Sequence, residues 1–430
     1  MANTAGWSER LTALNDALAD LYPTVDESRR LVTLARLPTR SIKFSDAAVI
    51  NWFNILEEAR RRGRVQALAT AALVDFPDHE VLSAAVDVSP VSAGRGGETV
   101  TIASTLGEAG DLSYEPALRV TQIAASIHNL LTLAESPLVT CRVRNGGRTT
   151  RHVRMRARIE RLSDPAVDLV PLAAGAAHEF RLLPRLIPEQ IAAISDTTRA
   201  TVTTAIDVDE KPVYERGSDI WVLPRGVAPL DQRDPTSGEL KDMTPYMGAF
   251  VTPRKQEVTN LLAGIAARLP DGVSLNGYKG TDYSVKAQVT AIFETLKELK
   301  LAYVNAVLAH SPDAAWLNQL VQLPRETLAS RRANCVEGMV LMASLMEAVG
   351  LNPALTFVPG HAFVAWETWP DNGTWHYLET VDLQDKTFEE AYAAGGRTAD
   401  AFQRRSTGNP RMFRRWDMRT LRARGIAPLE

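Results

Sequence analysis

The chain has 430 residues, of which 45% are hydrophobic and 23% are charged. These values are typical of soluble globular protein and exclude a mainly disordered chain, a collagen and a coiled-coil rod. At about 100–200 residues per domain, the length predicts two to four domains. The 48 basic and 51 acidic residues give a formal net charge of -3, so no overall positive field attracts nucleic acid.

The N-terminus and the cysteines indicate the compartment. The first residues lack a basic segment followed by an apolar one, and no apolar run approaches the ~20 residues that span a bilayer. Two cysteines, Cys141 and Cys335, are too few for a disulfide scaffold, and neither cysteine nor histidine spacing fits a metal site. We therefore expect a cytoplasmic protein with reduced thiols, no metal or other cofactor, and no membrane or nucleic-acid partner.

Residues 1–88 have the pattern of a compact helical unit. Apolar residues recur at helical spacing from Leu11 to Leu21, and further helices are predicted over 24–37, 45–63, 64–75 and 78–86. The third helix has arginines in its last turn, followed by Gly63, which suits the helix dipole and a left-handed C-terminal cap.

This unit resembles effector-associated domain 1 of bacteria. The resemblance is carried by Trp52, Gly63 and the segments 18–23, 42–44 and 55–59. It implies a death-fold-like helical adaptor, which would pair with a matching domain on a partner protein in a defence or conflict system. The alternative is a helical bundle that packs on its own chain.

Residues 97–225 are predicted to form a β-sandwich of immunoglobulin-like type. After a Gly-rich linker, strand-like runs occur at 98–104, 138–145, 150–160, 178–184, 199–207 and 219–224. The turn Asn145-Gly146-Gly147 lies between two alternating runs, which predicts a β-hairpin. We expect Cys141 to be a buried core thiol.

The second alternating run carries three arginines on one face. Arg154, Arg156 and Arg158 alternate with apolar residues, so they lie on the side of the strand opposite to the core. Such a row could bind phosphate, but a solvated outer strand gives the same pattern. No aromatic residues are interleaved to stack on bases, which favours the solvated strand.

Residues 226–430 contain the predicted nucleophile. Helices are predicted over 253–268, 284–298 and 301–308, and another begins at Cys335 and ends at Gly350. Asn334 is the predicted N-cap, which places Cys335 at the first helical position. There the free backbone N–H groups and the positive end of the dipole favour the thiolate, the nucleophilic form.

A general base is predicted on the following β-strand. His361 follows Gly360 at the start of that strand, and the next strand offers Glu379 and Asp382 as acids that could orient the imidazole. A three-residue hairpin loop would place odd-numbered positions beside His361 and select Glu379, whereas a two-residue loop would select Asp382. The pattern alone leaves both open. His376 is expected to point outward.

The oxyanion of the reaction needs at least two donors. The backbone N–H of Cys335 is the first. Gln319, in the segment that leads to the cysteine helix, and Asn276, in the sequence LNGYKG, are the candidates for the second.

The C-terminal part resembles the transglutaminase-like cysteine peptidase superfamily. The resemblance covers most of 245–430 and is carried by LNGYKG, NQLVQLPRETLASRRANCVEGMVLMASLMEAVGLNP, PGHAFVAWE, HYLET and WDMRTLRARGIAPL. It implies a papain-like α+β fold with Cys335 as nucleophile, His361 as general base and acid, and Glu379 as the orienting carboxylate. Val336 stands where many relatives have Trp, which weakens the case for a transamidase-type substrate tunnel.

The sequence thus predicts a multidomain α+β protein with an adaptor at 1–88, a β-sandwich at 97–225 and a cysteine peptidase at 226–430. We expect it to hydrolyse peptide or isopeptide bonds in a protein substrate. We also expect residues 1–85 to take no part in the catalytic cleft. Two alternatives are a glutamine transamidase or deamidase that uses the same residues, and an inactive transglutaminase-like scaffold.

Overall fold

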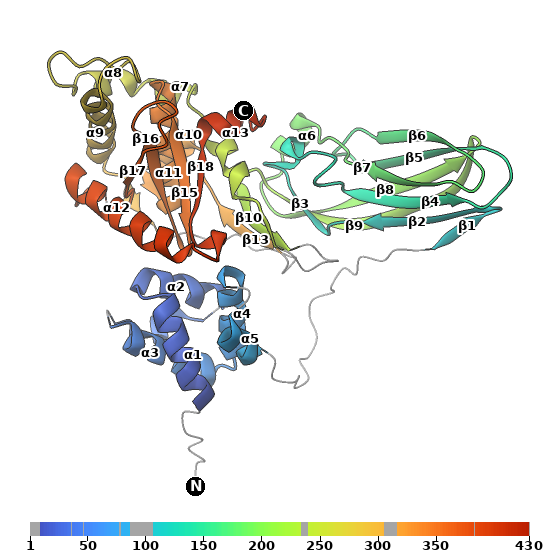
Figure 1. Cartoon of the computed structure of the whole chain (residues 1–430), viewed down its shortest axis with the longest axis horizontal. Coiled ribbons are helices and arrows are strands. Elements are labelled where there is room, and N and C mark those ends of the chain that lie inside the picture. Colours follow the sequence, from blue (N-terminus) through green and yellow to red (C-terminus); the bar gives the residue numbers. More distant parts are fainter. Residues whose placement is uncertain are drawn as a thin grey trace, which may run out of the picture.

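A computed structural model describes residues 9–35, 37–45, 47–76, 79–86, 106–233, 240–304, 316–381 and 383–429. The chain is a multidomain α+β protein. Its N-terminal helices, its long β-strands and its mixed C-terminal part occupy three different regions of the molecule (Figure 1). The segment 89–97, predicted as a linker, and the predicted strand 98–104 lie outside the described residues.

The N-terminal part is a bundle of helices, as the apolar spacing predicts. Trp52 is fully buried in it, and its indole N–H donates to the carbonyl of Tyr22 at 2.8 Å. Gly63 ends the third helix with a positive φ of 62°. The elements are α1 (Glu9–Leu21), α2 (Val25–Leu34), η1 (Thr39–Ser41), α3 (Ala48–Arg61), α4 (Val65–Asp75) and α5 (Glu80–Val86).

Two β-sheets form the middle of the chain and share one hydrophobic core. Cys141 lies in this core, as predicted, and is fully buried. The first sheet has the strand order β1 (Gly107–Ala109), β2 (Leu112–Leu118), β4 (Val139–Asn145), β7 (Ala177–Leu182). The second has the order β3 (Gln122–Ala124), β9 (Lys211–Leu223), β8 (Thr198–Val208), β5 (Arg151–Ile159), β6 (Ala166–Leu172). The short elements η2 (His128–Leu130) and α6 (Pro188–Ala192) connect strands.

The hairpin prediction at Asn145-Gly146-Gly147 is wrong. The strands on either side, β4 and β5, belong to different sheets, so the turn carries the chain across the core. The fully buried Asn145 stabilises this crossing, because its side-chain amide donates to the carbonyls of Thr149 and Leu172 at 2.8 and 2.9 Å. A side chain that binds backbone groups distant in sequence leaves no local pattern.

The row of arginines on β5 is paired within the sheet. Arg154 and Arg156 both contact the buried carboxylate of Asp207 on β8, at 2.8 and 3.2 Å, and Arg158 pairs with Glu160. Because these carboxylates already balance the arginines, the row is a solvated strand face rather than a phosphate site.

A four-stranded antiparallel sheet is the centre of the C-terminal part. Its order is β17 (Trp375–Leu378), β16 (His361–Glu367), β15 (Pro353–Val358), β18 (Arg414–Asp417). The almost entirely buried helix α11 (Cys335–Ala348) packs on β15 and β16, and α12 (Phe388–Arg405) packs on β17. Around them lie η3 (Thr244–Phe250), α7 (Gln256–Thr259), α8 (Leu262–Ala266), α9 (Asp282–Glu298), α10 (Pro324–Ser330), η4 (Pro410–Met412) and α13 (Met418–Ala423).

Two small sheets complete this part. One has the order β11 (Leu240–Asp242), β10 (Val227–Arg233), β13 (Trp316–Leu320), and the other pairs β12 (Ala302–Tyr303) with β14 (Arg332–Ala333). The helix predicted over 301–308 is therefore wrong where the structure describes it. Residues 302 and 303 are extended because they pair in parallel with the strand just before α11. Residues 305–308 lie outside the described part.

The three parts are joined by buried apolar contacts. One hydrophobic cluster includes Leu223 from the end of the β-sandwich together with the core around α11. Another includes side chains of α1–α5 together with Val358, Phe363 and Phe402 of the C-terminal part. In Figure 1, α2 is the N-terminal helix that faces α12 and the ends of β15–β17.

Candidate catalytic site

Cys335 lies at the first position of α11, as predicted. Asn334 is the N-cap: its side chain accepts a hydrogen bond from the N–H of Glu337 at 2.9 Å, and Glu337 accepts one from the N–H of Asn334 at 2.9 Å. This capping box fixes the first turn, and the backbone N–H of Cys335 stays among the groups that the helix leaves unpaired. Cys335 is only 5% exposed, and it lines a cleft.

His361 is the first residue of β16 and lies beside Glu379. Its Nε2 and the Oε2 of Glu379 are 2.7 Å apart. The register of β16 and β17 explains why: Ala365 pairs with Tyr377, so odd positions of both strands share one face. The connection between them is longer than either loop considered from the sequence, but its register has the parity that selects Glu379. Asp382 lies outside the described residues.

Cys335 also acts on the imidazole, because its side chain is one of the groups that raise the pKa of His361. Nε2 faces Glu379, which leaves Nδ1 as the other ring nitrogen. The thiol, the imidazole and the carboxylate line one cleft. A nucleophile, a base and an orienting acid suit acyl transfer.

The surroundings of His361 and Glu379 favour the charged form of both side chains. Burial lowers the pKa of His361, but the Glu379 carboxylate and the hydrogen bonds with Cys335 and Glu379 outweigh burial and hold that pKa well above its usual value. Burial raises the pKa of Glu379, yet His361 and the N–H groups of Thr380 and Val381 bring it below its usual value. The pair is therefore an imidazolium and a carboxylate at neutral pH.

The two oxyanion candidates differ in position. Gln319 on β13 is 3% exposed and lines the same cleft as Cys335. Asn276 does not line the cleft. Its turn is bound to α9 through Gln288, and the neighbouring Gly277 packs against Gly350, beyond the far end of α11. At 1.5 Å per residue, that end is about 20 Å from Cys335.

The prediction for His376 is wrong, since this side chain does not point outward. Its Nδ1 lies 2.7 Å from the hydroxyl of Tyr392 on α12, and its ring is tilted against Trp366. The α12 helix covers this end of β17, which the pattern of the strand alone does not reveal.

Gly338 and Thr380 position Glu379, and no motif in the sequence indicates this role for either residue. A Cβ on Gly338 would lie 3.2 Å from the Cβ, Oγ1 and carbonyl oxygen of Thr380. The hydroxyl of Thr380 donates to the carbonyl of Cys335 at 3.4 Å. The segment that carries Glu379 thus rests on the first turn of α11. A glycine inside a helix was the only available signal, because it usually marks a close approach.

The cleft has a volume of about 940 Å³, and N-terminal helices form part of its wall. The expectation that residues 1–85 take no part in the cleft is therefore wrong. Thr24, Glu27, Arg30 and Asp75 line it together with the catalytic candidates. A contact between segments so far apart in the chain depends on how the parts pack, and no local pattern encodes it.

Residues 6–89 match the family model of effector-associated domain 1. This confirms the resemblance of the N-terminal helices, which are called the effector-associated domain from here on. A search of curated proteins found no match for the chain. None of the described helices combines the length and the apolar character that crossing a membrane requires.

The effector-associated domain lies directly beside the predicted base. Gly360, the residue before His361, has a φ of 79°, and a Cβ there would lie 3.0 Å from the Nε of Arg30 and 3.5 Å from the Cγ of Glu27. Both belong to α2, whose N-terminus is closed by a capping box between Thr24 and Glu27. The domain therefore contacts the turn that positions His361.

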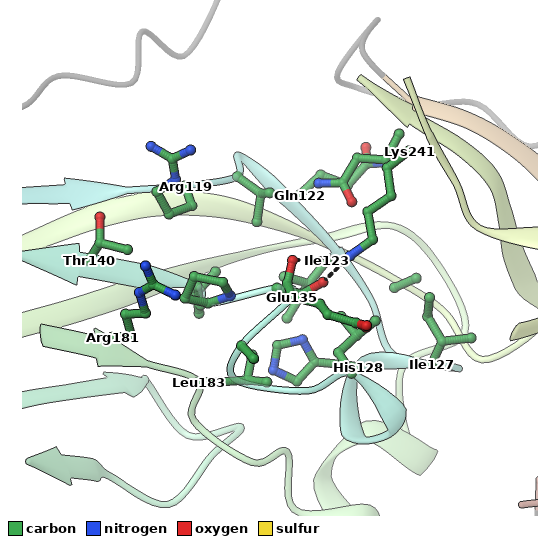
Figure 2. Close-up of a pocket in the computed structure, with 18 of the residues that line it drawn as sticks. Arg119, Gln122, Ile123, Ile127, His128, Glu135, Thr140, Arg181, Leu183 and Lys241 are labelled. Carbon is green, nitrogen blue, oxygen red and sulfur yellow. Dashed lines mark hydrogen bonds between the residues drawn. The ribbon is translucent and has the colours of Figure 1, made fainter. Parts of the chain in front are cut away.

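A second cavity, of about 310 Å³, lies where the β-sandwich meets the C-terminal part (Figure 2). Lys241 donates to the carbonyl of Glu135 and to the hydroxyl of Ser136, at 3.1 and 2.5 Å. None of the predicted site residues lines this cavity. Across the described part of the chain, no group of three or more His, Cys, Asp or Glu side chains is placed to hold a metal ion.

Proposed function

We propose that this protein is a cysteine peptidase of transglutaminase-like type, with a papain-like C-terminal domain and an immunoglobulin-like β-sandwich. The observation that supports this most is the contact between His361 Nε2 and Glu379 at 2.7 Å, in the same cleft as Cys335. A structural histidine needs no nucleophile nearby. The position of Cys335 at a capped helix N-terminus adds a physical reason for its reactivity.

The reaction proceeds through a thioester. The Cys335 thiolate attacks the carbonyl carbon of the scissile bond, and the oxyanion accepts a hydrogen bond from the Cys335 N–H, with Gln319 as the candidate second donor. The His361 imidazolium gives its proton to the leaving amine as the carbon–nitrogen bond breaks. Neutral His361 then takes a proton from water, the hydroxide attacks the thioester, and the Cys335 sulfur leaves.

The effector-associated domain is a death-like adaptor in this proposal. It pairs with a matching domain on a partner protein in a bacterial defence or conflict system in the cytoplasm. Tethering raises the local concentration of the enzyme at its target to roughly millimolar without a new contact in the active site. The match over residues 6–89 supports this role.

Thiol labelling tests the catalytic assignment. Iodoacetamide at neutral pH should label Cys335 in the folded chain much faster than Cys141, because burial raises the pKa of Cys141 to about 12. A fluorescent peptidyl acyloxymethyl ketone should label the wild-type chain and spare Cys335→Ala. If iodoacetamide labels both cysteines at the same rate and the ketone labels neither, the protein is an inactive transglutaminase-like scaffold and not a peptidase.

The reaction type needs a second experiment. Mapping of new protein N-termini in cells that carry wild type or Cys335→Ala should reveal cleavage that only the wild type produces. Incorporation of a labelled amine into proteins without new termini would instead indicate glutamine transamidation by the same residues.

A further inference from the structure

We propose that the catalytic cleft binds an acidic stretch of polypeptide, held between cations of the effector-associated domain and cations of α12. The inference names the substrate class and rests on the proposed function of Cys335. It follows from the charges along the cleft, taken together with the ion pairs that are already made there.

The cleft has walls from distant parts of the chain. One wall is α2 and η1 of the effector-associated domain, and another is the last half of α12. Cys335, His361 and Glu379 lie in the same cavity. Its volume of about 940 Å³ is at the upper end of the range for small-molecule sites, so it has room for a peptide segment.

The carboxylates of the cleft are already neutralised or occupied. Asp75 pairs with Arg30, Asp231 pairs with Arg411 and Arg414, and Glu379 pairs with His361.

Glu27 is the remaining carboxylate in the cleft. It accepts hydrogen bonds from the N–H and hydroxyl of Thr24, at 2.9 and 2.8 Å. Burial raises the pKa of Glu27, although Thr24, Arg30 and Arg405 counter it. None of these groups is therefore available to balance further positive charge.

Three exposed arginines in the cleft, Arg40 at η1 and Arg397 and Arg405 on α12, form no ion pair with a carboxylate of the described residues. Arg405 acts on Glu27 only at longer range, where it helps to lower the pKa of that carboxyl. Arg397 and Arg405 lie eight residues apart on α12, and Ala401, midway between them, also lines the cleft. Residues at this spacing share one face of a helix, so the two arginines lie on the side of α12 that faces the cleft. Guanidinium groups bind carboxylates in a planar, two-pronged geometry.

A peptide fits these cations better than a nucleic acid does. The nucleophile is a thiolate, which reacts with the carbonyl carbon of an amide, and its base is placed for proton transfer to a leaving amine. Aspartate and glutamate side chains on either side of the attacked bond would then reach the arginines on the two walls. Electrostatic attraction of this kind raises association rates and weakens with added salt.

Three matched probes test the proposal on the full chain. They share one acyloxymethyl ketone and differ only in the two residues that precede it, which are Asp and Glu, Ser and Gly, or two Lys. We expect the acidic probe to label Cys335 about tenfold faster than the neutral probe at low salt, with the ratio shrinking towards one at 0.5 M NaCl. The lysine probe should be the slowest.

Arginine variants locate the binding groups. The pair Arg397→Gln and Arg405→Gln should reduce the ratio of acidic to neutral labelling to about two, and Arg397→Glu with Arg405→Glu should make the lysine probe the fastest. Arg40→Gln should reduce the ratio in part. Arg254→Gln is the control, because this exposed arginine does not line the cleft.

The labelling results distinguish a wrong catalytic assignment from a wrong substrate class. If no probe labels Cys335, the catalytic assignment itself is wrong. If all three probes label Cys335 at the same rate, the site stands and the acidic substrate class is wrong. If a twelve-nucleotide RNA blocks labelling by the neutral probe while an acidic peptide without a ketone does not, the cations bind nucleic acid and the proposal is overturned.

Discussion

Arg30 of the effector-associated domain lies against Gly360, the residue that precedes His361. A Cβ on Gly360 would lie 3.0 Å from the Arg30 Nε, and Arg30 in turn pairs with Asp75 of α4. The turn between β15 and β16 thus rests on α2 of the N-terminal domain, which α4 holds through Asp75, while the turn positions the predicted base. Any movement of the domain relative to the cleft must change the surroundings of His361.

Gly360→Ala should destabilise the chain more than Gly373→Ala. Both glycines have a positive φ, 79° and 69°, so alanine costs about 1–2 kcal/mol of backbone strain at either position. Only at position 360 does the added Cβ also meet Arg30, whereas position 373 is open. We expect a larger drop in thermal midpoint and slower labelling of Cys335 in Gly360→Ala. Equal midpoints would mean that the domain does not rest on this turn in solution.

Glu379→Gln should lower the pH at which His361 loses its proton. The Glu379 carboxylate is what outweighs burial and keeps the pKa of His361 well above its usual value. Without that charge the imidazolium loses its proton at a lower pH, so the acid that protonates the leaving amine is lost earlier as the pH rises.

The same change should slow labelling at pH 7 by about 10²-fold or more, because the base is no longer oriented. Asp382→Asn, the other acid considered from the sequence, should have little effect. An NMR titration of His361 measures the shift, and the labelling rate at pH 7 measures the loss of reactivity. If Asp382→Asn slowed the labelling of Cys335 more than Glu379→Gln does, Asp382 and not Glu379 would be the acid that orients His361.

Gly338→Ala should slow labelling of Cys335 without unfolding the chain. Alanine favours helix by about 1 kcal/mol over glycine, but its Cβ would press on Thr380 and shift the adjoining Glu379. Gly396→Ala on α12 is the control, since a Cβ there meets nothing within 4 Å. Thermal midpoint and labelling rate together separate the two effects. Normal labelling in Gly338→Ala would show that Thr380 does not position the acid.

His128 should make the folded chain sensitive to mild acid. It is buried beside the second cavity, where its Nε2 lies 2.9 Å from the carbonyl oxygen of Pro184, and burial lowers its pKa to about 4 (Figure 2). The unfolded chain binds this proton near pH 6.5 and the folded chain does not. The contribution is therefore complete above pH 6.5 and declines as the pH falls towards 4.

The expected loss of stability from His128 between pH 7 and pH 5 is about 2 kcal/mol. His128→Gln keeps a donor for Pro184 but does not titrate, so its thermal midpoint should fall less over this interval than that of the wild type. Parallel curves for the two chains would show that His128 is protonated in the fold.

Local signals explain why much of the candidate site could be predicted. Asn334 caps a helix because a short polar side chain reaches the N–H of Glu337 three residues later, and such an interaction can be recognised within one turn. The apolar runs that became α11 and β16 are likewise buried where periodicity predicts. Choosing between Glu379 and Asp382 required the register of β17, which depends on the geometry of the connecting loop.

The sequence by itself determined the helices of the effector-associated domain, most of the strands of the sandwich, and Cys335 and His361 as the pair that could react. Periodicity, capping and turn chemistry act within a few residues, so they can be recognised along the chain. Only the tertiary structure decided that Asn145 crosses between sheets, that Asn276 lies far from Cys335, and that α2 forms a wall of the cleft. Each of these depends on contacts between residues many positions apart, whose free energy comes from packing whole elements together and not from any local preference.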